Sequence, residues 1–204
     1  MPELPEVETT KNAILPFKGK TLQRVIVNNP SLRWPVDEKA INKIKEVKIL
    51  SISRRAKYIF LHLDEMTIII HLGMTGTFRI QKLGSNETRK HDHVIFEFSK
   101  EILIFNDPRR FGSLHVSKDP QDHFLIKHLG PEPLEDNFNA EYLYKKIKKA
   151  GVSTKAFLMN QKNVVGIGNI YACEILFSSG ISVSYTHLRA HETGRNLVCR
   201  LLLE

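Results

Sequence analysis

The chain has 204 residues, of which 42% are hydrophobic and 25% charged, enough for one large or two small globular domains. A net charge of +8, from 30 Lys and Arg against 22 Asp and Glu, favours a polyanionic partner, with nucleic acid the first candidate. Two cysteines exclude a disulfide framework and a four-cysteine zinc site. The apolar runs are too short for a bilayer and the acidic N-terminus is unlike a signal peptide, so we expect a cytoplasmic protein.

The first part of the chain has the pattern of an antiparallel β structure. A short helix is predicted over residues 6–15, ended by Pro16 and Gly19. Runs rich in β-branched and aromatic residues then alternate with turn residues, which indicates an antiparallel sandwich or barrel. A small helix is expected within this region, at residues 37–44. The predicted strands are residues 24–27, 47–50, 58–61, 67–70, 77–80, 94–98 and 102–105.

Beyond residue 118 the pattern becomes helical. A helix is predicted over residues 140–149, with Leu143 and Ile147 on its apolar side, and Ser153 is expected to cap the next helix. A glycine-containing segment, residues 164–171, leads into a further helix that ends near Gly180. The predicted organisation is a β-rich domain, a linker with two prolines, a smaller helical domain and a tail. Their bounds are 1–118, 119–136, 137–183 and 184–204.

The opening residues have two interpretations. Removal of Met1, which the small residue after it favours, would make Pro2 an N-terminal secondary amine, with a pKa of about 8 against about 10.4 for lysine. Such an amine can attack an aldehyde-level carbon to form an iminium ion, and Glu3 is close enough to exchange the proton. Proline and glutamate also suit the first turn of a helix, and on these residues alone the helix start is the simpler interpretation.

Three further segments allow either a structural or a DNA-binding role. Cations at residues 54, 55 and 57 either protect a strand edge or bind a phosphate, with Lys57 near the reacting centre. In two glycine-containing loops, residues 71–76 and 106–112, the large apolar side chains either cover the core or fill a DNA stack after base extrusion. In the second case Arg109 would hydrogen-bond the widowed base.

Two other motifs are less specific. Gly166-Ile167-Gly168 lacks the third glycine and the strand–helix–strand unit of a dinucleotide-binding loop. It is either a plain turn between helices or a turn that presents backbone N–H groups and Asn169 to an anion. His91-Asp92-His93 could suggest metal ligands, but no partner ligands accompany them, so no metal site is expected.

Six motifs, in this order along the chain, resemble those of bacterial formamidopyrimidine-DNA glycosylases, which remove oxidised purines such as 8-oxoguanine. The endonuclease VIII branch is less similar, because it lacks the loop of residues 107–112 in this form. The resemblance implies an α+β fold: an N-terminal antiparallel β-sandwich with flanking helices, then a truncated helix-two-turn-helix domain, with double-stranded DNA between the two. It extends to about Ile181. The motifs are residues 2–9, 55–58, 71–74, 90–93, 107–112 and 166–171.

The resemblance also implies a catalytic set. Pro2 would attack C1′ of the flipped nucleotide, release the base and leave a Schiff base. Glu3 would be the general acid that protonates the sugar ring oxygen as the ring opens. Lys57 would contact the phosphate beside the lesion and assist β- and δ-elimination.

DNA contacts follow from the same resemblance. Met74, Arg109 and Phe111 would fill the gap left by the extruded nucleotide. Lys155 is a weaker candidate, near the lesion or the backbone. Contacts chiefly with phosphates are implied for His71, His91 and Asn169.

Two features depart from the family pattern. The family ends with a four-cysteine zinc finger that also carries a phosphate-binding arginine, whereas this chain stops at Glu204, so no cofactor is expected. Residues 184–204 resemble vector- or adaptor-derived sequence. The intact parent is expected to be a monomeric glycosylase and abasic-site lyase, and this chain to bind oxidised or abasic DNA weakly. The alternatives are a non-catalytic DNA-binding protein and an inert fragment that is stable only as its β-sandwich.

Overall fold

The computed structural model describes residues 2–85 and 87–182, and the chain divides into two compact units on either side of residues 123 and 124. This division lies within the predicted linker of residues 119–136. The predicted tail, residues 184–204, and the proposed removal of Met1 lie outside the described residues.

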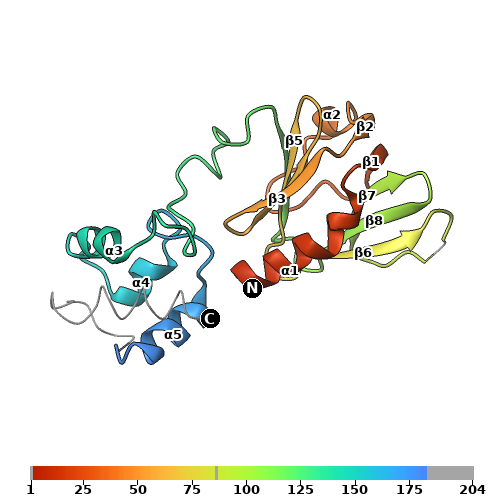
Figure 1. Ribbon diagram of the computed structural model, residues 1–204. Helices are drawn as coiled ribbons and strands as arrows, with labels where there is room; N and C mark the ends of the chain where they lie inside the picture. The colour runs from red at the N-terminus through yellow and green to blue at the C-terminus, as the bar shows by residue number, and fades with distance from the viewer. Residues whose placement is uncertain (1, 86, 183–204) are drawn as a thin grey trace. The chain divides into compact units, whose positions relative to one another are not determined.

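The described residues of the first unit form two antiparallel sheets and two α-helices, which confirms the predicted α+β fold with an antiparallel sandwich (Figure 1). The helices are α1 (Leu4–Ile14), which continues into a 3-10 turn, Leu15–Phe17, and α2 (Glu38–Ile41). The first sheet has the order β2 (Lys45–Lys48), β1 (Thr21–Val27), β7 (Asp92–Phe98), β8 (Glu101–Asn106) and β6 (Thr77–Lys82). The second has the order β3 (Ser51–Arg55), β4 (Tyr58–His62), β5 (Thr67–His71) and β9 (Ser113–Ser117).

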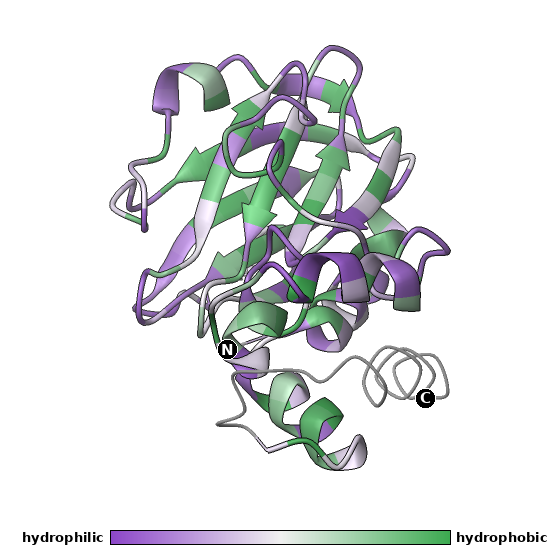
Figure 2. Cartoon of the chain, turned by 90° about the vertical axis from the view of Figure 1, so that its left-hand side faces the viewer, coloured by the Kyte–Doolittle hydropathy of each residue, from purple (hydrophilic) through white to green (hydrophobic). Residues whose placement is uncertain are grey.

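The two sheets share one hydrophobic core. Hydrophobic and hydrophilic residues are interspersed along the strands (Figure 2), and the hydrophobic ones of both sheets bury their side chains in the same cluster. Phe96 and Phe98 of β7 are buried there with Ile59 of β4 and Ile68 of β5. Because each fully buried side chain of this size contributes roughly 1.5–3 kcal/mol, this core is the main support of the loops at the sheet ends.

Two strands were not predicted as such. The predicted strand at 47–50 is interrupted because the chain crosses between sheets there: Ile49 exchanges backbone hydrogen bonds with Gly19 and Lys20, whereas the Leu50 N–H donates to the His62 carbonyl. Residues 51–55 then form β3. β9 has only two apolar residues, and it becomes a strand by pairing with β5 along its whole length. In both β3 and β9, pairing with a neighbouring strand rather than the local sequence makes the segment a strand.

Within residues 124–182, the second unit has three helices, α3 (Ala140–Ile147), α4 (Thr154–Met159) and α5 (Asn169–Ser178), around its own core. Leu143 and Ile147 are buried in that core, as predicted. Ser153 caps α4 as predicted, since its Oγ accepts from the Ala156 N–H at 3.2 Å. In the part of the chain that the structure describes, no helix combines the length and the apolar character needed to cross a membrane.

Candidate active site and nucleic-acid-binding loops

The N-terminal residues form the start of helix α1, and this helix start also buries the carboxyl group of Glu3. Glu3 is the N-cap of α1, and its carboxylate accepts from the backbone N–H of Glu6. In return, the Glu6 carboxylate accepts from the Glu3 N–H at 2.9 Å, which completes a capping box. Glu3 is only 3% exposed, and Pro2 beside it is half-buried. The helix-start interpretation is therefore correct, and it leaves a fixed carboxyl group next to residue 2.

Lys57 lies close enough to this acid to interact with its charge. It occupies the turn between β3 and β4, after Ala56, whose φ of 54° places it in the left-handed region. Burial lowers the pKa of Lys57, and the negative charges of Glu3 and Glu6 partly offset that change. Since Lys57 is 5% exposed, it is not a solvated residue that protects a strand edge.

Arg54, on the strand before this turn, is used within the unit. Its Nε donates to the Glu8 carboxylate of α1 at 2.8 Å, and its Nη1 donates to the Ala56 carbonyl at 2.9 Å. β3 is an edge strand of its sheet, and α1 packs against it. Arg54 thus fixes α1 and the turn that carries Lys57 relative to each other.

His71, at the end of β5, is held as a neutral hydrogen-bond donor. Its Nδ1 accepts from the Gly73 N–H at 3.0 Å, so the neutral ring carries its proton on Nε2. Burial lowers the pKa of His71 to about 4, and the positive charges of Arg33 and Lys57 act in the same direction. The ring of Tyr58 packs against it at a centroid distance of 4.9 Å. At neutral pH His71 can therefore offer a phosphate an N–H group without a charge.

The low pKa of His71 predicts a pH-dependent stability. Between the unfolded pKa of 6.5 and the folded pKa of about 4, the unfolded chain binds more protons, so stability present above pH 6.5 is lost as pH falls through this window. His71→Asn, whose amide oxygen can still accept from Gly73, should show a smaller loss. Urea denaturation at pH 7 and pH 5 measures it. Equal losses in the two proteins would contradict this assignment.

The two loops that follow β5 and β8 are joined by one buried carboxylate. Asp107 is fully buried and accepts from Thr75 Oγ1 at 2.5 Å and from the Gly112 N–H at 2.7 Å. Thr75 Oγ1 in turn accepts from the Arg109 N–H at 3.2 Å. The loops also touch directly, because Gly73 has a φ of +65° and lies against the backbone of Gly112.

This frame presents the predicted wedge side chains to solvent. Met74 is 39% exposed and Phe111 is 44% exposed, so covering the core does not account for either residue. The guanidinium of Arg109 lies 4.9 Å from the centre of the Phe111 ring, within the range of a cation–π contact. The structure therefore places these three side chains on two adjoining loops, with Arg109 against Phe111.

The His91-Asp92-His93 segment is used for hydrogen bonds rather than as a set of metal ligands. Asp92 binds Arg79 and Asn106, and His93 Nε2 lies 2.8 Å from the Asp107 carbonyl oxygen. His91 is partly exposed. Among residues 2–85 and 87–182, no three His, Cys, Asp or Glu side chains are grouped to hold a metal ion, and Cys173 is the one cysteine. The described residues therefore do not fit the zinc site of the family pattern.

In the second unit, a single side chain shapes the glycine turn. Gln161 Oε1 accepts from the Gly166 N–H at 2.9 Å, and its Nε2 donates to the Ile167 carbonyl at 3.0 Å. Gly166 has a φ of +82°, and Gly168 is the N-cap of α5. Asn169 is thereby exposed in the first turn of a ten-residue helix, where backbone N–H groups favour an anion. Lys155 is half-buried in the first turn of α4.

Several supporting residues had no role in the sequence-based prediction: Arg33, Tyr58, His93, Asp107 and Gln161. Most of their contacts join residues that lie far apart in the sequence, as with Thr75 and Asp107. The one available signal was the position of Asp107, a carboxylate directly after an apolar strand and before a run of cations. A buried carboxylate needs hydrogen-bond donors, and the Thr75 hydroxyl and the Gly112 N–H supply them here.

The fold and these motifs define a two-unit protein of the helix-two-turn-helix class. The sequence of residues 1–114 matches the family model of the formamidopyrimidine-DNA glycosylase N-terminal domain. Residues 129–200 match the family model of the formamidopyrimidine-DNA glycosylase H2TH domain. The chain belongs to the formamidopyrimidine-DNA glycosylase family, which confirms the resemblance. The second match continues past residue 183, where the helical domain was predicted to end, and includes most of the predicted tail.

Curated relatives and solved structures agree with this assignment. The chain is 50% identical over 185 residues to the formamidopyrimidine-DNA glycosylase of Hydrogenovibrio crunogenus, covering 89% of this chain and 65% of that protein. With the enzyme of Escherichia coli O7:K1 it shares 49% identity over 183 residues, covering 89% and 67%. A complex of the Lactococcus lactis protein with DNA containing an abasic site has a TM-score of 0.89 at 30% identity, covering 98% of this chain and 75% of that one. The chain thus spans about two thirds of the length of these curated relatives.

Proposed function

We propose that this chain carries the catalytic machinery of a base-excision-repair DNA glycosylase and abasic-site lyase that acts on oxidised purines in double-stranded DNA. The observation that carries the proposal is the capping box at the start of α1, which fixes a buried carboxyl group beside residue 2 and near Lys57. The net charge of +8 supports a DNA partner. Structures of the Lactococcus lactis relative with abasic-site DNA and with Fapy-dG DNA support the substrate class.

In this mechanism the first step is nucleophilic substitution at the sugar. The nitrogen of N-terminal Pro2 forms a bond to C1′, while the bond from C1′ to the base breaks, its electron pair leaves with the base, and the base takes a proton from water. The Glu3 carboxylate takes the proton that the Pro2 nitrogen loses and gives it to the ring oxygen, so the sugar opens and an iminium ion joins Pro2 to C1′. The negative charges of Glu3 and Glu6, at the start of α1, favour the ammonium form of Lys57, which binds the phosphate beside the lesion.

The second step is strand cleavage. The iminium carbon withdraws electrons and acidifies the C2′–H bond, so that loss of this proton expels the 3′ phosphate with its bonding electrons. A second elimination expels the 5′ phosphate in the same manner. Lys57 assists by binding the departing phosphate, while hydrolysis of the remaining imine returns Pro2 as a free amine.

Loops at the end of the sandwich supply the other requirement, a nucleotide held outside the stack. Extrusion costs a few kcal/mol of unstacking. The exposed side chains of Met74 and Phe111 can occupy the vacated space, and Arg109 has the planar donor geometry to bond the widowed base. His71, His91, Lys155 and Asn169 are proposed to bind the DNA backbone.

Borohydride trapping tests this function directly. The wild-type chain incubated with abasic-site duplex and borohydride should give a covalent complex, and mass spectrometry should place the reduced sugar on the peptide that begins at Pro2. Pro2→Ala, which offers a primary amine, should cross-link less efficiently. Binding without any cross-link would instead support the alternative, a non-catalytic DNA-binding protein.

A further inference from the structure

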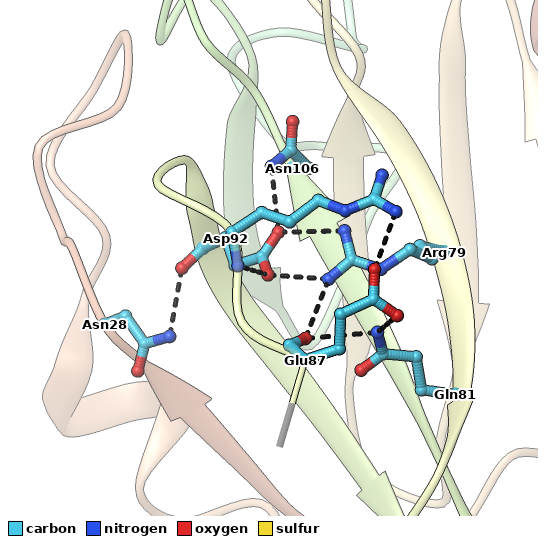
Figure 3. A network of polar contacts seen from close by, with 7 residues as sticks. Asn28, Arg79, Gln81, Glu87, Asp92 and Asn106 are labelled. Atoms are coloured by element: carbon cyan, nitrogen blue, oxygen red, sulfur yellow. Dashed lines mark hydrogen bonds and ion pairs between the residues drawn. The ribbon is translucent and has the colours of Figure 1, made fainter. Parts of the chain in front are cut away.

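A partly buried ion pair lies at the end of the first sheet, outside the proposed catalytic set. Asp92, at the start of β7, is 7% exposed, and Arg79 of β6 donates to its two carboxylate oxygens at 2.7 and 3.3 Å (Figure 3). The same carboxylate accepts from Asn106 Nδ2 at 2.8 Å and from the Arg89 N–H at 2.8 Å. A pair of this kind is weak support for stability, because desolvation offsets much of its attraction.

The ion pair fixes the turn that leads into β7. The Arg89 N–H donates to the Asp92 carboxylate, and the Asp92 N–H donates back to the Arg89 carbonyl at 3.1 Å, which closes residues 89–92 into a turn. Lys90 is exposed and His91 is partly exposed on this turn. Arg79 also reaches the Glu87 carbonyl, at 3.4 Å, so one guanidinium binds both the turn and the segment before it (Figure 3).

The same turn is attached to the loop that carries Arg109 and Phe111. The Asp107 N–H donates to the His91 carbonyl at 3.1 Å. Asn106, which binds the Asp92 carboxylate, immediately precedes Asp107 and pairs with Asp92 in the sheet register. The backbone at His91 is therefore hydrogen-bonded to the base of the loop of residues 107–112, which we call the wedge loop.

We propose that Asp92 is a positioning residue for DNA binding: through its ion pair with Arg79 it holds the turn of residues 89–91 so that His91, with Arg89 and Lys90, binds backbone phosphates beside the wedge loop. This inference rests on the proposed function. A turn fixed before binding loses less conformational freedom on the DNA than a loose one does, which raises affinity without a new contact.

A double-mutant cycle separates positioning from a purely structural role. Asp92→Asn should weaken binding of a duplex with a tetrahydrofuran abasic-site analogue by about tenfold, a coupling typical of residues in one hydrogen-bond network. It should also reduce the salt slope by about 1, the change expected for one lost phosphate contact. In an Arg89→Ala/Lys90→Ala/His91→Ala background the effect should largely disappear. If Asp92→Asn weakens binding equally in that background, the positioning role is wrong.

The matched control is Glu97→Gln, the same chemical change further along β7. Glu97 pairs with Arg24 at 3.0 Å, far from the turn, and its loss should leave DNA affinity unchanged. Because Asp92→Asn leaves the partly buried Arg79 guanidinium without its counter-charge, the cycle is repeated with Arg79→Gln/Asp92→Asn, in which two amides replace the charges. Independence in both cycles would overturn the proposal. A wild-type chain that neither binds nor cross-links would contradict the proposed function instead.

Discussion

Replacing Glu3 by Gln should lower the rate of base excision by about 10²–10⁴-fold, the usual contribution of a general acid. Gln cannot give a proton to the ring oxygen of the sugar. Its amide oxygen can still accept from the Glu6 N–H, so α1 should begin at the same residue. Single-turnover excision of 8-oxoguanine paired with cytosine, measured beside the binding of the same duplex, separates lost chemistry from lost affinity.

Two controls sharpen this expectation. Glu6→Gln keeps an acceptor for the Glu3 N–H and should retain most of the excision rate. On a preformed abasic site, whose sugar opens without losing a base, Glu3→Gln should cross-link far more efficiently than it excises. Equal losses for Glu3→Gln and Glu6→Gln would assign the effect to the helix cap, and the acid role would be wrong.

Substitution of Gly73 by Ala should be among the most destabilising single changes in the first unit. At a φ of +65° a side chain is strained, and the added Cβ would lie 2.3 Å from the Gly112 nitrogen and from the Phe111 carbonyl carbon. We expect the free energy of unfolding to fall by roughly 2–5 kcal/mol, from about 1–2 for the backbone conformation and about 1–3 for overpacking. The loop bearing Phe111 must move, so affinity for abasic-site DNA should fall as well.

Gly84 provides the matched control for this prediction. Its φ is +84°, and an added Cβ would meet nothing within 4 Å, so Gly84→Ala carries the strain without the collision. For Gly84→Ala the free energy of unfolding should fall by about 1–2 kcal/mol, and DNA affinity should be unchanged. Denaturant titration and binding assays on the two variants isolate the loop contact. If both variants behave alike, the close approach of the loops does not contribute.

Local sequence patterns predicted most of the fold, because they determine the conformation of the segment in which they occur. The caps, the turn glycines and the apolar runs each specify their own segment, so Ser153 and the core face of α3 were found from the sequence. β3 and β9 were missed because their polar residues become strands only beside β4 and β5. Pairing between distant segments leaves little trace in five residues.

The candidate site shows the same division. The order of Pro2 and Glu3 could be read as a helix start or as an acid beside an amine, and the structure shows that one capping box both starts the helix and fixes the acid beside residue 2. The roles assigned to Lys57, His91 and Asn169 remain predictions. Asp107 and Gln161 could not be given a role beforehand, because each acts through hydrogen bonds to backbone groups of a turn that folding has to bring to it.

In the two loops, the residues that hold the backbone in place through Asp107 differ from the side chains that the loops expose. Backbone amides, one hydroxyl and one carboxylate fix the path of the chain, whereas Met74, Arg109 and Phe111 extend from that path without supporting it. These three side chains can accordingly be substituted without loss of the loop structure. Libraries of variants that differ only at these positions can be screened for altered lesion preference, and their melting temperature should stay constant.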